Sequence, residues 1–296
     1  MVVVKLMGGL GNQLFQYSAG FALAQRLGVR LLLDTSFLEN KATETVYTKR
    51  NFELGYLSVK AGLSTPQEVS KLFRVERNKL FRKLSMRFPS LLHNAVYNER
   101  GYIFNEAFSE LKDPVYLNGF WQSEKYFANI REELIRTHFN PVETISERNK
   151  ALLDQINSCN SVSVHVRRTD YVTDAKTNSF HGLCTPFYYL KACSYIAERT
   201  ESLHFFMFSD DPEWVKDNLK LKFPATYISH NKGDESFWDM YLMRFCKHNI
   251  IANSSFSWWG AWLNNFDKKI VVVPQKWFND PEANKNDIVP ETWIRL

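Results

Sequence analysis

Short apolar segments alternate with helical patterns along the second half of the chain. Five segments rich in β-branched or aromatic residues are predicted strands: 161–166, 203–208, 225–229, 249–252 and 269–273. The candidate helices between them begin at Thr185 and Pro186 or cover 211–219, 235–246 and 254–265. Strict alternation of strands and helices predicts a parallel sheet with helices on both faces. We therefore expect a Rossmann-like domain over residues 156–296.

The first half of the chain opens with the same kind of pattern. Its predicted elements are strands over 2–6, 30–34 and 115–121 and helices over 14–27 and 123–139. The first two strands and the helix between them form a βαβ unit, and the turn after the first strand is rich in glycine. These elements predict a βαβ start to a first domain over residues 1–155, so the expected fold class is α/β with two domains.

Composition narrows the class of protein. The 296 residues are 45% hydrophobic and 23% charged, as in an ordinary globular protein, and the formal net charge is +5. A charge this small does not indicate nucleic-acid binding, and no motif of a nucleic-acid reader occurs. The opening MVVVKLMGG reads as a strand and not as a signal peptide, and no run of 18 apolar residues occurs. We therefore expect a cytoplasmic protein without a transmembrane helix.

Polar side chains follow the predicted strands of the second half. Arg167 and Arg168 come after the first strand, Asp210 after the second, and Ser254 and Ser255 after the fourth. Ligands of a doubly wound sheet bind beyond the carboxyl ends of its strands. Arginines hold phosphate oxygens, free N–H groups at the start of a helix attract anions, and a carboxylate can accept from a ribose hydroxyl or from guanine. Together these residues predict a nucleotide-diphosphate site.

Each of these residues also has a plainer interpretation. Asp210 or Ser254 taken alone is more typical of a helix N-cap, and adjacent arginines on a loop are usually solvated.

In the first half, the glycines in 9–11 follow a strand and precede Asp34, as in a dinucleotide fingerprint. Leu14 stands where the third glycine of that fingerprint belongs, which counts against an NAD-dependent oxidoreductase.

Three motifs resemble the bacterial α-1,2-fucosyltransferases of glycosyltransferase family 11. They are MGGLGNQLFQYSAGFALAQRLG (7–28), HVRRTDY (165–171) and NSSFSWWGAWL (253–263), and their order and spacing fit essentially the whole chain. The resemblance implies a GT-B-type architecture, in which two Rossmann-like domains flank an interdomain cleft. It also implies GDP-β-L-fucose as the donor, the 2-hydroxyl of a galactoside as the acceptor, and inversion at the anomeric centre. The acceptor-side domain would cover residues 1–155, and the GDP-fucose-binding domain would cover residues 156–296.

The resemblance also implies roles for individual residues. Arg167 would contact the pyrophosphate of the donor, and Arg168 would brace the loop through carboxylates. His165 and Asp210 look like guanosine contacts, and residues 254–256 look like the wall of the phosphate and fucose site. The implied donor-binding residues are Asn12, which would face the cleft from the first domain, and His165, Arg167, Asp210, Ser254, Ser255 and Phe256.

The positions of the Asp residues in the sequence indicate whether a metal is expected and which side chain could act as the catalytic base. No D-x-D triplet occurs, so we expect no metal and no other cofactor, with the fixed charge of Arg167 stabilising the departing GDP. Inversion by direct displacement requires a base that takes the proton of the acceptor hydroxyl. Asp170 and Asp174 are the nearest carboxylates to the phosphate loop, which makes them, beside Arg167, the candidate catalytic residues. Animal relatives often carry a Glu in the glycine-motif segment, where this chain has Gln13 and Gln16, so no Glu is assigned as the base.

The enzyme interpretation is fucosyl transfer in glycan or O-antigen biosynthesis. Its alternatives are a nucleotide-sugar-binding protein without turnover and a fucosyltransferase of different linkage. The expected partners are GDP-fucose and a galactose-containing acceptor, free or lipid-linked. Residues 71–88 carry seven Lys or Arg against one Glu, and they predict either a solvated helix with one packed face or a peripheral contact with an anionic membrane.

Overall fold

The protein divides into two compact units. The structure, a computed structural model, describes residues 1–40, 50–73, 78, 80, 81, 83, 87, 95–168, 172, 178–180 and 182–296. Unit 1 comprises Met1–Val142 and Asn286–Ile288, and unit 2 comprises Glu143–Lys285 and Val289–Leu296. The division falls before the expected boundary at residue 155, because helix α7 (Glu147–Asn157) belongs to unit 2. No helix in these described ranges is long and apolar enough to cross a membrane.

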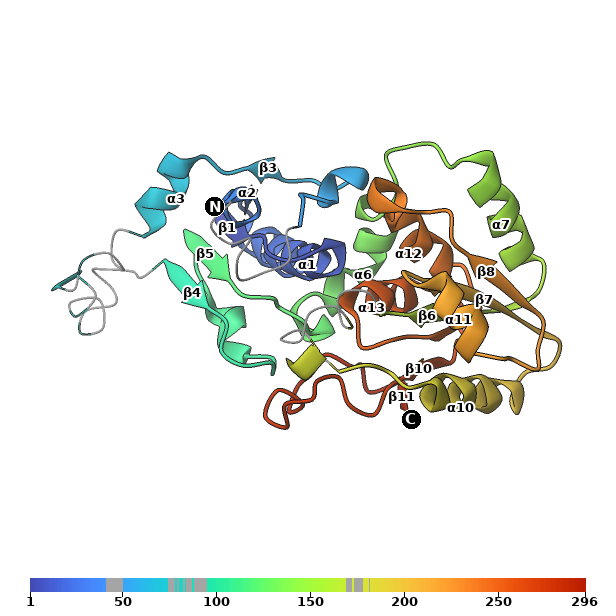
Figure 1. Cartoon of the computed structure of the whole chain (residues 1–296). Coiled ribbons are helices and arrows are strands. Elements are labelled where there is room, and N and C mark those ends of the chain that lie inside the picture. The colour runs from blue at the N-terminus through green and yellow to red at the C-terminus, as the bar shows by residue number, and fades with distance from the viewer. Residues whose placement is uncertain are drawn as a thin grey trace. The chain divides into compact units, whose positions relative to one another are not determined.

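Unit 1 is built on a parallel five-stranded sheet (Figure 1). Its strands are β1 (Val2–Lys5), β2 (Leu31–Asp34), β3 (Gly62–Leu63), β4 (Val96–Asn98) and β5 (Val115–Asn118). The order is β3-β2-β1-β5-β4, so β1, in which Val2, Val3 and Val4 are fully buried, lies in the centre. The sequence pattern misses β3 and β4, because they contain only two and three residues and lie at the two edges.

Helix α1 (Leu10–Leu27) follows β1 and begins four residues before the predicted start. It packs very close to the sheet at Gly20, where an added Cβ would lie 2.2 Å from Cγ2 of Val4. A dinucleotide fingerprint makes this close approach through its third glycine. In this chain that position is Leu14, and the close approach is made further along the helix.

The glycine turn before α1 is filled by the protein's own side chains. The carboxylate of Glu53 accepts a hydrogen bond from the N–H of Leu10, in the first turn of the helix. Gln13 and Gln16 are fully buried, and their side-chain amides bond to five backbone groups of the turn and of neighbouring loops. A dinucleotide would place its pyrophosphate at this helix N-terminus. Because Glu53 occupies that place, the geometry counts against NAD binding.

The predicted helix over 123–139 is not continuous. Phe127 has φ −148° and ψ 9°, which is outside the helical range and separates two short 3₁₀ turns. The segment is divided into η4 (Glu124–Tyr126), η5 (Ala128–Ile130), α6 (Arg131–Glu133) and the π-helical η6 (Leu134–His138). The other helical segments of unit 1 are α2 (Ser36–Glu39), η2 (Leu54–Tyr56), α3 (Pro66–Leu72) and η3 (Glu106–Glu110).

Unit 2 contains a parallel six-stranded sheet in the order β11-β10-β9-β6-β7-β8. The strands are β6 (Asn160–Val166), β7 (Leu203–Ser209), β8 (Ala225–Ile228), β9 (His248–Ile250), β10 (Val271–Val273) and β11 (Ile294–Arg295). Besides α7, its helices are α10 (Pro186–Ala197), α11 (Pro212–Asn218), η7 (Gly233–Glu235), α12 (Phe237–Met243) and α13 (Ser255–Trp262). The α/β class and the five predicted strands of this half are confirmed, and the two-residue β11 is added.

The alternation of SVSVHV in β6 separates two buried faces of this sheet. Val162, Val164 and Val166 pack with α10 and α11 in one hydrophobic core. Ser163 and His165 point to the opposite face, where His165 lies against Phe256 of α13. Alternation usually marks a strand with one solvated face, whereas here the polar positions are buried under a second layer of helices.

Candidate functional site

The strand order of unit 2 creates a topological switch point between β6 and β9. The chain runs from β6 to β7 and β8 on one side and then returns to β9 on the other side. Ligands of open α/β sheets bind outside the carboxyl ends of the strands at such a point. The segment after β6 carries Arg167 and Arg168, and the segment after β9 leads into α13. The two ends that the sequence marks with charged and hydroxyl side chains are therefore neighbours.

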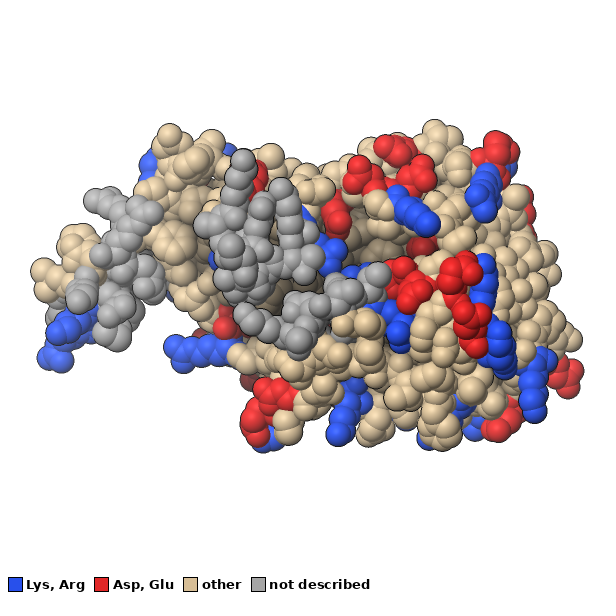
Figure 2. Space-filling view, in the orientation of Figure 1, with Lys and Arg blue, Asp and Glu red and all other residues tan. Residues whose placement is uncertain are grey.

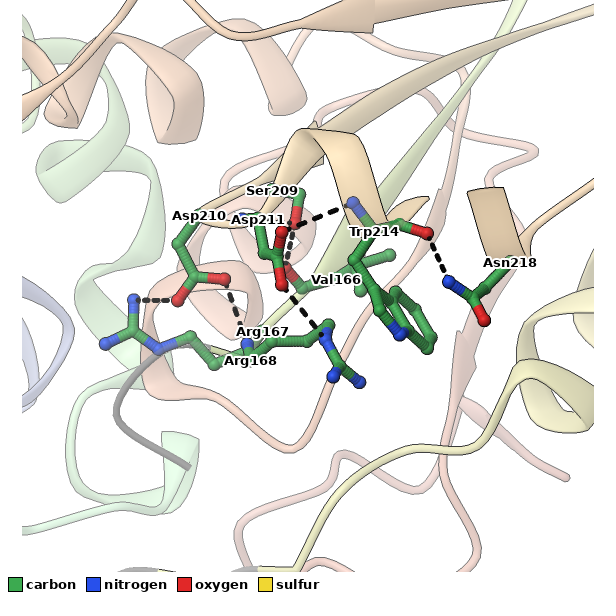
Figure 3. Close-up of polar contacts among 8 residues, drawn as sticks. All are labelled: Val166, Arg167, Arg168, Ser209, Asp210, Asp211, Trp214 and Asn218. Carbon is green, nitrogen blue, oxygen red and sulfur yellow. Dashed lines mark hydrogen bonds and ion pairs between the residues drawn. The ribbon is translucent and has the colours of Figure 1, made fainter. Parts of the chain in front are cut away.

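Arg167 and Arg168 leave the end of β6 in opposite directions (Figure 3). Nη1 of Arg167 lies 3.1 Å from Oδ2 of Asp210, in an ion pair with side chains 24% and 20% exposed. Nε of Arg168 lies 3.4 Å from Oδ2 of Asp211, and its guanidinium carbon lies 3.6 Å from the ring centroid of Trp214. Arg168 is thus held on two sides, by Asp211 and by Trp214, and its side chain is 17% exposed. Arg167 is also paired with a carboxylate, and its side chain is slightly more exposed, at 24%.

Asp210 and Asp211, the two carboxylates that follow β7, position Arg167 and Arg168, which we call the arginine loop. Asp210 also accepts the backbone N–H of Arg168 at 2.9 Å, and Asp211 caps α11 by accepting the N–H of Trp214 at 3.2 Å. Acidic and basic side chains consequently lie next to each other on the surface over α11 (Figure 2). The sequence interpretation identified Asp210 but missed Asp211 and Trp214 as partners of Arg168. The guanosine role of Asp210 stays a prediction, since its carboxylate here bonds to the arginine loop.

His165 lies under this loop and is 5% exposed. Its ring centroid is 5.6 Å from that of Phe256, which joins the end of β6 to the first turn of α13. Burial lowers the pKa of His165 to about 4, against a smaller opposing effect of Asp210, so the imidazole is neutral at pH 7. Within the part of the chain that the structure describes, Nδ1 of this buried ring has no hydrogen-bond partner. A buried polar atom of this kind is available to a ligand.

The N-terminus of α13 forms the other side of the switch point. Ser254 stands at the N-cap with φ −135° and ψ 128°, but its hydroxyl makes no capping hydrogen bond to the helix. Ser255 and Phe256 form the first turn and are partly exposed, and Ser254 is 9% exposed. Backbone N–H groups at a helix start attract anions, and this N-terminus lacks the side-chain cap that commonly satisfies one of them. His165, Arg167 and the start of α13 thus lie at the adjoining ends of β6 and β9, where they offer a cation, a neutral imidazole and a helix N-terminus.

Three other predicted site residues are not part of this group. Asp170 and Asp174 lie outside the described residues. Asn12 belongs to α1 in unit 1, where its Oδ1 accepts a hydrogen bond from Nε2 of Gln122 at 2.8 Å. Across the described ranges, no group of three or more His, Cys, Asp or Glu side chains could hold a metal ion.

A polar network beyond β8 contains a further unusual carboxyl group. Nδ2 of Asn231 donates to Oδ1 of Asp239 on α12 at 2.7 Å, and Asn149 of α7 bonds to Asn231 and His230. Burial raises the pKa of Asp239 to about 7, although the hydrogen bond from Asn231 acts in the opposite direction. The network ties α7 and α12 to the segment after β8, and the sequence interpretation did not identify it.

The raised pKa of Asp239 predicts a pH-dependent loss of stability. An unfolded Asp ionises near pH 3.9, so the folded state, which keeps its proton up to about pH 7, loses stability as the pH rises between these values. Asp239→Asn is therefore expected to be more stable than the wild type at pH 8, by up to about 4 kcal/mol, with the difference shrinking toward pH 4. Urea unfolding at several pH values measures this. The exposed Asp154→Asn on α7 is the control, and a difference for Asp239→Asn that is constant with pH would contradict the prediction.

Comparison with known proteins extends over the whole chain. The model of glycosyl transferase family 11 matches residues 65–296. The chain is 38% identical over 298 aligned positions to an α-1,2-colitosyltransferase of Escherichia coli, with 100% of this chain and 99% of the relative covered. It is 34% identical over 314 aligned positions to the O-antigen biosynthesis glycosyltransferase WbnK of Escherichia coli, with 98% and 99% covered.

One solved structure supports the fold. A mutant of Arabidopsis thaliana FUT1 in complex with GDP matches the chain with a TM-score of 0.52 at 11% sequence identity. The match covers 92% of this chain and 70% of that chain. At this identity the likeness concerns the arrangement of helices and strands alone.

Proposed function

Because the chain belongs to glycosyltransferase family 11, we propose that it transfers L-fucose from GDP-β-L-fucose to the 2-hydroxyl of a galactoside, with inversion of the anomeric centre. The observation that carries the proposal is the β6–β9 switch point, where Arg167, buried His165 and the start of α13 adjoin. A nucleotide diphosphate is the ligand that this combination of cation, neutral imidazole and helix N-terminus suits.

The proposed chemistry rests on charge that develops on the leaving group. Cleavage of the bond between fucose and phosphate leaves GDP with additional negative charge. Arg167, oriented by Asp210, and the N–H groups of the first turn of α13 are fixed donors that bind this charge more strongly as it grows. No metal is needed in this scheme. The base, for which Asp170 and Asp174 are the candidates, and the GT-B-type cleft stay predictions.

The relatives also suggest the setting of the reaction. One is named an O-antigen biosynthesis glycosyltransferase, and we propose that the galactoside acceptor of this protein is likewise part of an O-antigen. The cytoplasmic location and the contact of residues 71–88 with an anionic membrane stay predictions, and most of that segment lies outside the described residues.

Colitose is the second candidate for the transferred sugar. The relative with 38% identity over the whole chain is named an α-1,2-colitosyltransferase. Colitose is the 3-deoxy counterpart of L-fucose, so both sugars present the same 6-methyl group and the same anomeric centre to an enzyme. The donor must therefore be established by direct comparison of GDP-fucose and GDP-colitose.

The test is an assay of the purified protein with GDP-fucose, lactose and EDTA. We expect release of GDP and a product whose NMR spectrum shows an α-1,2 linkage, because the proposed chemistry uses the charge of Arg167 and no metal. A parallel reaction with GDP-colitose ranks the two donors by kcat/KM. Another linkage in the product would replace the proposed regiochemistry. Binding of GDP-fucose without GDP release from any galactoside in a panel would favour the binding protein without turnover.

A further inference from the structure

Three neighbouring strand ends of unit 2 meet at one buried side chain. Strand β9 lies between β10 and β6, and Asn253 follows it by three residues, directly before Ser254 at the N-cap of α13. Asn253 is only 4% exposed, although its amide is polar. The carboxyl ends of parallel strands meet at one edge of a sheet, so the segments that follow β10 and β6 come close to Asn253.

The side-chain amide of Asn253 bonds to both of these segments. On the β6 side, Nδ2 donates to the carbonyl oxygen of Gly182 at 3.4 Å, and Oδ1 accepts from Sγ of Cys184 at 3.4 Å. On the β10 side, Nδ2 donates to the carbonyl oxygen of Trp277 at 3.2 Å. A primary amide has two N–H donors and an acceptor oxygen, so this one side chain joins the segments after β6, β9 and β10.

The two outer segments also hold each other directly. The backbone N–H of Asn279, after β10, donates to the carbonyl oxygen of Phe180 at 2.8 Å. Nδ2 of the same residue donates to the carbonyl oxygen of Asn178 at 3.1 Å, and the rings of Phe180 and Phe278 lie 4.8 Å apart. Asn253 therefore bonds to two segments that are already fixed to one another, which makes them a rigid support.

The local sequence of both segments fits this close contact. Gly182 has φ +71°, and an added Cβ there would lie 2.5 Å from Oδ1 of Asn279, so only glycine suits the position. After β10, Oδ1 of Asn284 accepts the N–H groups of Trp277 and Phe278 at 3.0 and 2.9 Å. Both of these aromatic side chains are 2% exposed, so the carbonyl of Trp277 that faces Asn253 is held in place.

The direction of the first turn of α13 depends on the residue that precedes it. The hydroxyl of Ser254 makes no capping bond, so the described contacts of Asn253 are the side-chain bonds that tie this helix start to its surroundings. Backbone N–H groups stabilise a developing charge only when they are fixed in advance and point at it. A helix start that serves a diphosphate therefore needs a support of this kind.

We propose that Asn253 is a positioning residue for the donor diphosphate, which aims the first-turn N–H groups of α13 by bonding to the segments on both sides of β9. This inference rests on the proposed function, since the diphosphate is that of its donor. Asn253 itself is not placed in contact with the ligand. Its effect on binding is exerted through the backbone of residues 254–256.

Calorimetric titration with GDP tests the proposal. Asn253→Ala is expected to raise the Kd for GDP roughly tenfold or more, because the helix start is no longer held in the binding geometry. The matched control is Asn264→Ala, at the other end of α13. Asn264 is 1% exposed, and its Nδ2 donates to the carbonyl oxygen of Cys246 at 2.7 Å. Both variants lose buried hydrogen bonds and should unfold at a lower temperature, but the control is expected to keep the wild-type Kd.

A second variant reaches the same support from the β6 side. Gly182→Ala is expected to weaken GDP binding, because its Cβ would displace Asn279. Its control is Gly28→Ala, which has a similar φ of +65° but no atom within 4 Å of the added Cβ. If both variants act through one support, the double variant with Asn253→Ala should lose less affinity than the two single losses together. Gly182→Ala also carries the test if Asn253→Ala does not fold.

The outcomes separate this inference from the proposed function. If the wild type binds GDP and Asn253→Ala and Gly182→Ala bind it equally well, the positioning role is wrong and the proposed function stands. Equal losses of affinity in Asn253→Ala and Asn264→Ala would also overturn it, since they would reflect general destabilisation. If the wild type does not bind GDP, the proposed function is wrong and the role of Asn253 fails with it.

Discussion

Arg167→Ala is expected to lower kcat/KM for fucosyl transfer by about 10²–10³, the usual effect of losing one fixed donor to a developing negative charge. Arg167 is the arginine that the resemblance assigns to the pyrophosphate, and its side chain is slightly more exposed than that of Arg168, which Asp211 and the ring of Trp214 hold. The loss should fall mainly on kcat, since the charge of the leaving group is greatest in the transition state. Steady-state kinetics with saturating acceptor measure both parameters.

Two further variants sharpen the interpretation of Arg167. Arg167→Lys retains the charge without the planar fork and is expected to recover part of the rate. Asp210→Asn removes the ion pair that orients Arg167 and is expected to have a smaller effect than Arg167→Ala. Arg136→Ala, an exposed arginine of η6 with an ion pair to Glu132, is the matched control. If Arg167→Ala keeps wild-type kcat, the leaving group is stabilised elsewhere and the proposed chemistry is wrong.

The position of Arg167 and Arg168 at the end of β6 could be predicted from the sequence, because it depends on local order along the chain. A strand that ends in two arginines places them at the carboxyl edge of a parallel sheet whatever the rest of the fold does. The resemblance implies that carboxylates brace Arg168, but which carboxylates pair with the two arginines could not be predicted. This pairing depends on the register of β6 and β7, which pairs Val166 with Ser209 and so brings Asp210 and Asp211 beside the arginine loop.

Tertiary contacts also decide the parts of the fold that the pattern missed. The segment 123–139 has helical periodicity, yet Phe127 leaves the helical conformation and its ring is fully buried. The turn after β5 is similar, since neither the 36% exposure of Phe120 nor the positive φ of Trp121 leaves a signal in local composition. Propensity is a weak guide wherever packing against distant residues outweighs it.

Ser254→Asp is expected to weaken GDP binding by about 10²–10³ while making the protein more stable. Ser254 stands at the N-cap of α13 without a capping bond, so a carboxylate there can accept helix N–H groups, which stabilises a helix by about 1 kcal/mol. A diphosphate bound at the start of α13 would lie close to this carboxylate. Repulsion of two like charges about 4 Å apart is on the order of 4 kcal/mol for an effective dielectric constant of about 20. Calorimetric titration with GDP and thermal unfolding measure the two effects separately.

A loss of GDP affinity together with a gain in stability distinguishes a phosphate site from an ordinary helix start. Ser254→Asn can cap the helix without adding charge and is expected to keep most of the affinity for GDP. Thr185→Asp places the same charge at the N-cap of α10, where Thr185 already accepts the N–H of Tyr188, and is expected to leave GDP binding unchanged. If Ser254→Asp is stabilised but binds GDP like the wild type, then the start of α13 is only a helix terminus. Arg167 would then have to hold the diphosphate without help from the N–H groups of α13.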